Sequence, residues 1–140
     1  RYVPFRDYPL IEQVRLIPEI AGVLYPDLSL REGILRLGRT VCPSFSASLL
    51  GKVLFSAVGN DVTMLIRAGS KSYTLSSNVG RFEVLELRDN FARVSLRDMF
   101  NFVDCYQVGI LEGALMMLGK QPQIQIRLDS LTSLEAELNW

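Results

Sequence analysis

The stretch 104–140 constrains the fold most, because an apolar helix interrupted by glycines runs there into a pair of alternating strands. Asp104 suits the start of the helix, where its carboxylate can cap backbone N–H groups at the positive end of the helix dipole. Gly119 and Pro122 predict its end, glycine as a left-handed stop and proline as a barrier to continuation. We therefore expect a helix over 104–119.

The two faces of this helix differ in side-chain size. One face is an ordinary apolar stripe at steps of three and four, made by Val108, Leu111, Leu115 and Leu118. The opposite row steps by fours through Cys105, Gly109, Gly113 and Met117. Two interior glycines each cost roughly 1 kcal/mol relative to alanine, so we expect them to let another backbone or a ligand approach closely. Close packing of the helix on a sheet is the favoured interpretation, with ligand contact as the alternative.

Gln107 and Glu112 are the strongly polar residues of the helix. A buried Glu112 would need an arginine partner or a raised pKa. A partly exposed, structural Glu112 is favoured over a functional carboxylate.

The closing segment 123–140 alternates apolar and polar residues with a period of two, as half-buried strands do. Keeping both apolar sets on one face centres the pairing on Leu131. We expect Arg127 opposite Glu135 and Ile124 opposite Trp140, so that charge and burial agree.

A second hairpin is predicted around the two-residue turn Asp89-Asn90. Apolar residues change parity between Val84 and Leu85, which predicts a bulge there or a face buried on both sides. Counting outwards from the turn predicts five pairs: Leu87 with Ala92, Leu85 with Val94, Glu83 with Leu96, Glu86 with Arg93 and Phe82 with Arg97.

The first part of the chain predicts short helices separated by prolines and capping residues. We expect an extended segment 1–7, then a helix from Pro9 that is capped by Asp7 and broken or kinked at Pro18, with a short second helix to Leu24. A helix over 30–41 would be capped by Ser29 with Glu32 and ended by Cys42-Pro43. The next helix would be capped by Ser44 or Ser46 and closed by Gly59-Asn60, and a brief turn or helix over 61–66 would be capped by Asp61. The Gly, Ser and Asn content of 68–80 predicts a long loop or edge segment.

The helix 30–41 is predicted to be amphipathic. It would bury Leu30, Ile34, Leu37 and Val41, and it would present Arg31, Arg36 and Arg39 to solvent, the favoured interpretation, or to a partner. The order of elements predicts one α+β domain over 1–140, in which a helical layer packs with a four-stranded antiparallel sheet and two hairpins flank the last helix.

Charge and length exclude several classes of function. Lys+Arg and Asp+Glu are both 15, so nothing steers the chain towards nucleic acid. The hydrophobic fraction of 49% leaves room for an internal cavity or a buried subunit interface. No apolar run reaches the roughly 18 residues of a transmembrane helix. There is no signal peptide and the chain opens on Arg1, so we expect a cytoplasmic protein with a preceding segment missing.

Histidine is absent from the sequence, which removes the usual general base and the commonest zinc and haem ligand. Cys42 and Cys105 lie far apart, so a structural zinc site is not expected. Two free buried thiols are favoured over a disulfide or a modified cysteine. Together these residues predict neither an enzyme nor a resident metal or cofactor.

Several segments resemble an uncharacterised paralogous family expanded in myxobacteria, whose members have no established activity. They are Phe5-Arg6-Asp7-Tyr8-Pro9, Leu30-Arg31-Glu32-Gly33 with Leu37-Gly38-Arg39, Phe45 to Gly51, and Asp104-Cys105-Tyr106-Gln107-Val108-Gly109 with Glu112-Gly113. The resemblance covers nearly the whole chain.

A wider resemblance is to the 4-vinyl reductase domain, whose tail is similar to the run from Gly109 to Gly119 and the closing hairpin. That domain is grouped with haem nitric-oxide-binding domains and TRAPP subunits in one α+β fold, which implies binding of haem, small molecules, an acyl chain or partner subunits. The haem branch carries a Tyr-x-Ser-x-Arg strand, with which Arg93, Ser95 and Arg97 align. Because the tyrosine is lost and no histidine can hold iron, haem binding in the usual way is not expected. Arg97 with Ser95 could contact an anion, although a solvated Arg97 is favoured.

We therefore expect a non-catalytic sensory or adaptor module. It would bind a small apolar or amphipathic ligand between the helices and the sheet, at Cys105, Gly109, Gly113 and Met117, with Arg97 as a further contact. The alternative is a protein-interaction domain that dimerises through exposed helices. A homodimer or another protein partner is expected, and nucleic acid is not.

Overall fold

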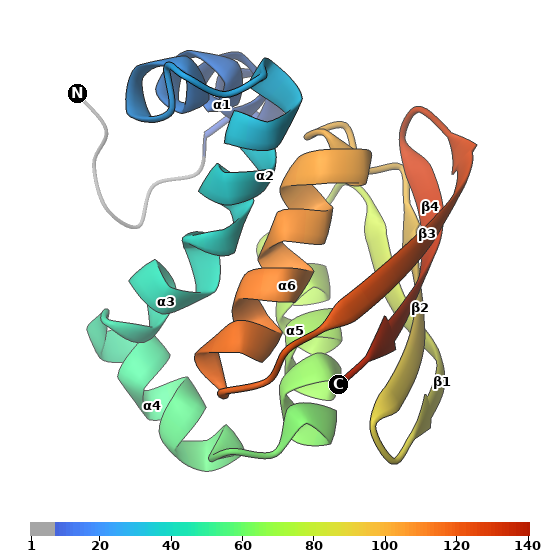
Figure 1. Ribbon diagram of the computed structural model, residues 1–140. Coiled ribbons are helices and arrows are strands. Elements are labelled where there is room, and N and C mark those ends of the chain that lie inside the picture. The colour runs from blue at the N-terminus through green and yellow to red at the C-terminus, as the bar shows by residue number, and fades with distance from the viewer. Residues whose placement is uncertain (1–7) are drawn as a thin grey trace.

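A four-stranded antiparallel sheet in the order β1-β2-β4-β3 carries the fold of the computed structural model (Figure 1). Its strands are β1 (Arg81–Arg88), β2 (Phe91–Arg97), β3 (Gln123–Ser130) and β4 (Ser133–Asn139). The structure describes residues 8–140, apart from the side chains of Leu50, Leu75 and Ser76. The predicted extended segment 1–7 and the predicted cap Asp7 lie outside the described residues.

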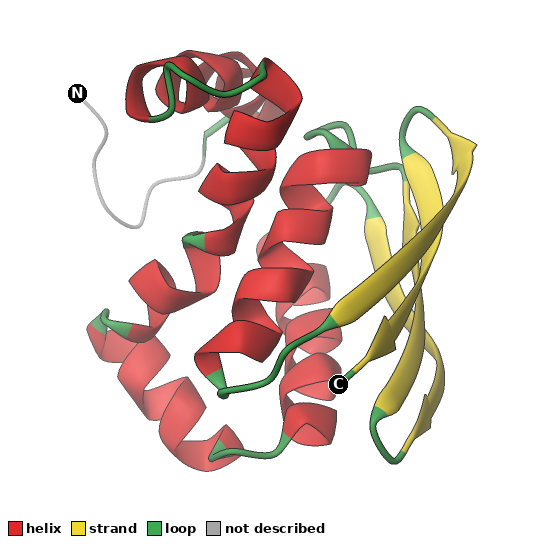
Figure 2. Ribbon diagram, viewed as in Figure 1, coloured by secondary structure: helices red, strands yellow, loops and turns green. Residues whose placement is uncertain are grey.

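The helices lie on one side of this sheet (Figure 2). They are α1 (Leu10–Leu24), α2 (Leu30–Arg39), α3 (Val41–Ser46), α4 (Leu49–Val58), α5 (Val62–Ser76) and α6 (Val108–Met117), the last preceded by a π-helical turn, η1 (Val103–Gln107). Helix α5 packs beside β1, and α2 packs beside α6. The predicted α+β architecture, with two hairpins flanking the last helix, is confirmed.

The core lies between the sheet and the helices. The inner face of the two central strands is fully buried and consists of Ala92, Val94, Leu96, Leu134, Ala136 and Leu138. Leu111 and Leu115 of α6 and Val62 and Ile66 of α5 belong to the same cluster. The apolar faces of the central strands, spaced by two residues, thus pack against the apolar stripes of α5 and α6, spaced by three and four.

The first hairpin contains the predicted bulge, which shifts the register beyond it. Leu87 pairs with Ala92 and Glu86 with Arg93, as predicted. Leu85 is then the extra residue of β1, because an inserted residue leaves one position unpaired. The other three predicted pairs are therefore wrong: the observed pairs are Val84 with Val94, Phe82 with Leu96 and Arg81 with Arg97.

The second hairpin pairs Arg127 with Glu135, as predicted. The predicted pair of Ile124 with Trp140 is wrong, and Ile124 lies opposite Leu138. Ile124 and Leu138 both lie seven residues from Leu131, so the observed pair fits the predicted centre of the hairpin.

Helix α1 continues through Pro18 without the predicted break. A proline inside a helix removes one backbone hydrogen bond. Ile17 and Ala21 on either side of Pro18 are both buried, and their packing offsets that loss. Packing of this apolar face keeps the helix intact to Leu24.

Two predicted helix boundaries between residues 29 and 60 change. Ser29 accepts the N–H of Glu32, as predicted, but α2 ends at Arg39 and Cys42-Pro43 lies inside the first turn of α3, where proline is tolerated. The cap of α4 is Ser48, which accepts the N–H of Gly51 at 3.0 Å, rather than Ser44 or Ser46. Gly59 closes α4 with a positive φ of 60°.

Asp61 caps α5, as predicted, by accepting the N–H of Thr63 at 2.8 Å. The predicted loop over 68–80 is wrong, because α5 continues to Ser76. Its apolar face packs on the sheet, and Ser70 Oγ donates to the carbonyl oxygen of Phe82 at 2.7 Å. Tertiary packing therefore overrides the low helix propensity of this segment.

Among the described helices, none is by itself long and apolar enough to cross a membrane. One sharply bent pair, Leu30–Ser46 with Gly51–Val58, reaches that length and composition only when the two are taken together.

Candidate functional site

The glycines of α6 face α2. A Cβ atom on Gly109 would overlap the carbonyl oxygen of Leu35, and one on Gly113 would overlap the backbone of Arg39. On the α2 side, a Cβ on Gly38 would overlap the carbonyl oxygen of Tyr106. These glycines therefore let another backbone approach closely, as predicted. The approaching element is helix α2, whereas the sequence favoured the sheet.

Two ion pairs flank this contact, Arg31 with Asp104 and Arg39 with Glu112. Arg39 Nε donates to Glu112 Oε2 at 2.6 Å. Both pairs join residues 73 positions apart, so α2 and α6 run parallel and in register. Parallel helices place like ends of their dipoles side by side, which is unfavourable, and the ion pairs offset part of that cost.

These pairs bear on three sequence expectations, of which the capping role of Asp104 is wrong. Arg31 and Arg39 remain exposed, at 61% and 38% of their side-chain surface, as the favoured interpretation predicts, but each also binds a carboxylate of the segment 103–117. Asp104 does not cap the helix through its side chain; Phe102, with φ 57°, begins the π-helical turn. Glu112, 19% exposed in its side chain, has the arginine partner that burial requires.

The predicted helix row also contains Cys105 and Met117, and both are at least partly buried, as is the second cysteine, Cys42. Cys105 is 3% exposed and packs with Ile17, Ala21 and Ile34, and burial raises its pKa. Burial raises the pKa of Cys42 to about 11, and neither thiol is in a disulfide. Both therefore stay protonated at neutral pH. Met117 lies half-buried at the end of α6, so a ligand along the whole row would have to displace α2.

A chain of polar side chains at the start of α6, running from the buried Gln107 and Asn101 to the exposed Gln13, was not predicted. Gln107 Nε2 donates to Asn101 Oδ1 at 2.7 Å, and Asn101 Nδ2 donates to Gln13 Oε1 at 3.3 Å. Tyr106, whose pKa is raised by burial, shares a further hydrogen bond with Gln13. The chain ties α1 to α6. The sequence signal for it was Gln107, a polar residue in an otherwise apolar helix.

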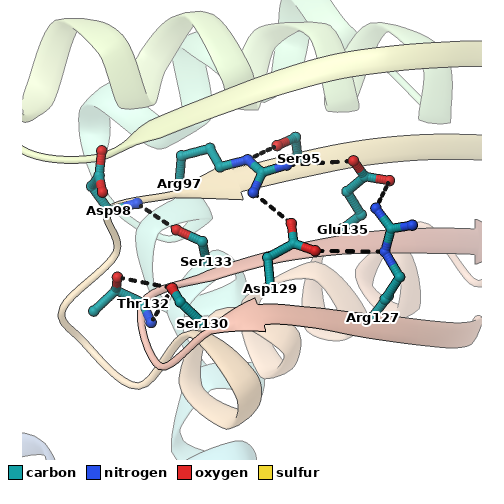
Figure 3. Close-up of polar contacts among 9 residues, drawn as sticks. All are labelled: Ser95, Arg97, Asp98, Arg127, Asp129, Ser130, Thr132, Ser133 and Glu135. Carbon is teal, nitrogen blue, oxygen red and sulfur yellow. Dashed lines mark hydrogen bonds and ion pairs between the residues drawn. The ribbon is translucent and has the colours of Figure 1, made fainter.

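Arg97 lies apart from the other predicted residues, on the sheet face that points away from the helices (Figure 3). Its Nε donates to Ser95 Oγ at 2.9 Å, and its two terminal nitrogens contact Asp129 and Glu135. Arg127 contacts the same two carboxylates. An anionic ligand at Arg97 would therefore have to displace a carboxylate, and the favoured solvated Arg97 is replaced by a network of ion pairs.

Two hollows among the described residues are open to solvent. One, of about 590 Å³, lies between α5 and β1 and is lined by Arg67, Ser70, Thr74, Phe82, Glu83, Val84 and Leu85. The other, of about 300 Å³, is mostly polar and is lined by Asn60, Asp61, Val62, Thr63, Asp89, Asn90, Lys120 and Trp140. Within residues 8–140 no group of three or more Cys, Asp or Glu side chains could hold a metal ion.

The fold is that of the H-NOX domains. An H-NOX protein from S. oneidensis, solved in its Fe(II)NO state, is 14% identical with a TM-score of 0.71, and the match covers 99% of this chain and 79% of that one. A mutant H-NOX protein from K. algicida, solved as Fe(II) without a ligand, is 14% identical with a TM-score of 0.70 and coverage of 99% and 77%. A mutant T. tengcongensis H-NOX protein is 14% identical with a TM-score of 0.68 and coverage of 99% and 78%.

By sequence, the chain belongs to the family described as protein of unknown function DUF2378, whose model matches residues 1–140. No curated protein sequence matches it.

Proposed function

We propose that this chain is a non-catalytic sensory or adaptor domain that binds a partner protein through its helices. The observation that carries the proposal is four exposed apolar side chains at the end of α1 and the start of α2, Ile20, Val23, Leu24 and Leu30, which we call the α1–α2 corner. Val23 is 79% exposed, and Leu30, predicted to be buried, is 55% exposed. Exposed apolar clusters on soluble domains are typical of interaction sites.

The packing of α6 supports a protein partner over a small ligand. The space that Gly109 and Gly113 leave is occupied by the backbone of α2. The structural neighbours are described with Fe(II) and NO, but this chain contains no histidine. We therefore propose that it does not hold haem through histidine.

A photo-reactive amino acid at Val23 tests the partner directly. It should cross-link a protein in the cells that produce the chain, because Val23 projects from the corner. The matched control is the same amino acid at Asn139, at the exposed end of β4. Equal labelling at both positions would show that the corner is not a specific binding surface.

A second candidate function is binding of a small amphipathic molecule in the groove between α5 and β1. Its volume of about 590 Å³ lies in the range of ~300–1,000 Å³ typical of ligand sites. Phe82, Val84 and Leu85 offer apolar contact, and Arg67 offers charge. Native mass spectrometry decides between the two: a retained small molecule would favour this candidate, whereas its absence with a cross-linked protein would favour the first.

Other sequence predictions remain proposals. They include ligand contact by Cys105, Gly109, Gly113, Met117 and Arg97, a myxobacterial source, and kinship with the 4-vinyl reductase domain and TRAPP subunits. The predicted cytoplasmic location is supported by two thiols that form no disulfide.

A further inference from the structure

The two edges of the sheet are protected to different degrees. Along β1, helix α5 packs beside the strand, Ser70 binds the carbonyl oxygen of Phe82, and Leu85 forms a bulge. Bulges and covering helices are the usual means by which proteins block an edge strand. Strand β3 pairs with β4 on one side, and among the described residues no strand pairs with its other side.

The inner face of the sheet also remains apolar at β3, beyond the cover of the helices. Ile126 is 36% exposed and Leu128 is 51% exposed. Their partners on β4, Ala136 and Leu134, are 0% exposed. An exposed apolar row on an unpaired edge favours addition of another strand.

We propose that β3 binds the β3 strand of a second copy of this chain. The two strands would pair antiparallel about a two-fold axis at Ile126, joining the two sheets into one. Antiparallel pairing of identical edges is self-complementary, so the contact closes as a dimer. This dimer is independent of the proposed α1–α2 partner surface.

The apolar side chains on the inner face of β3 favour a register centred on Ile126. Ile126 then faces the partner's Ile126, and Ile124 faces the partner's Leu128. Every apolar residue of the strand meets an apolar residue. The paired stretch 124–128 also stops short of the irregularity that follows Leu128 in the pairing with β4.

Charge on the outer face selects the same register and the second copy as occupant. Arg127 faces the partner's Gln125, so a guanidinium donor meets an amide oxygen. Centring on Arg127 would place two arginines directly opposite, which is destabilising. Centring on Leu128 would place Ile126 against serine.

Sedimentation velocity of the whole chain tests the dimer. We expect a concentration-dependent dimer whose Kd rises at least tenfold in Ile126→Lys, because the lysines would face each other across the axis. The matched control is Leu85→Lys on the β1 edge, where Leu85 is 45% exposed, and it should leave the Kd unchanged. A chain that stays monomeric at its highest soluble concentration would overturn the proposal, as would an Ile126→Lys variant that dimerises like the wild type.

Disulfide trapping tests the register. Directly opposed side chains have Cβ atoms ~4.5–5.5 Å apart, close enough for a disulfide after small shifts. Ile126→Cys should form a covalent dimer under mild oxidation faster than Leu128→Cys, while the half-buried Cys42 and the buried Cys105 react slowly. Faster trapping by Leu128→Cys, or a dimer that neither variant traps, would contradict pairing about Ile126.

Discussion

The two sides of helix α6 are packed by opposite means. Towards the sheet, Leu111 and Leu115 fill space with large side chains. Towards α2, Gly109 and Gly113 make contact by having no side chain. The sheet side can adapt to substitution by moving rotamers, whereas the α2 side meets backbone atoms that cannot move aside. The second side therefore specifies its partner more strictly.

Gly113→Leu should have the largest effect on stability. The new side chain would collide with the backbone of Arg39, so we expect a loss of about 4 kcal/mol or more in the free energy of unfolding, measured by urea denaturation. Gly22→Ala in α1 is the matched control, because nothing lies within 4 Å of its added Cβ. That control should gain roughly 0.5–1 kcal/mol. A Gly113→Leu variant as stable as the wild type would refute strict packing on the α2 side.

Leu115→Ala on the sheet side should have the next largest effect. Leu115 is 2% exposed, and a buried leucine truncated to alanine costs about 3 kcal/mol, less where neighbours close the cavity. Restoring volume with Leu115→Met should recover most of the loss in the same urea measurement. Failure of methionine to recover stability would show that the sheet side is as strict as the α2 side.

The ion pairs between α2 and the α6 segment should have the smallest effects. A double-mutant cycle of Arg39→Ala with Glu112→Ala should give a coupling of about 1 kcal/mol, because Glu112 is mostly buried. The pair of Arg31 with Asp104 is more exposed, so its cycle should give less than about 0.5 kcal/mol and should fall further with added salt. Equal couplings would mean that burial does not distinguish the two pairs.

Much of the fold follows from local patterns. Period-two alternation predicts both hairpins, and a change of parity predicts the bulge beside Leu85. Asp61 and Gly59 predict helix ends through their own backbone chemistry. The full length of α5 was not predictable in this way, because its polar, small residues become helical only through contact with the sheet.

The site was predictable only in part. Spacing identified Gly109 and Gly113 as places of close approach, but spacing cannot say which element approaches. The partner helix and the pairs of Arg31 and Arg39 depend on tertiary placement. The polar chain from Gln107 also depends on contact with α1, and the π-helical turn at Val103–Gln107 packs against α2.

The common offset of 73 residues in the two ion pairs has a consequence for how homologous chains can differ in length. Deleting one residue from α2 or α6 would turn the rest of that helix by about 100° around its axis. A glycine would then no longer face the backbone carbonyl of the other helix that it now contacts. Insertions in the connecting turns would leave the alignment of the two rods untouched. Length variation within the family should therefore collect in the turns and stay out of these two helices.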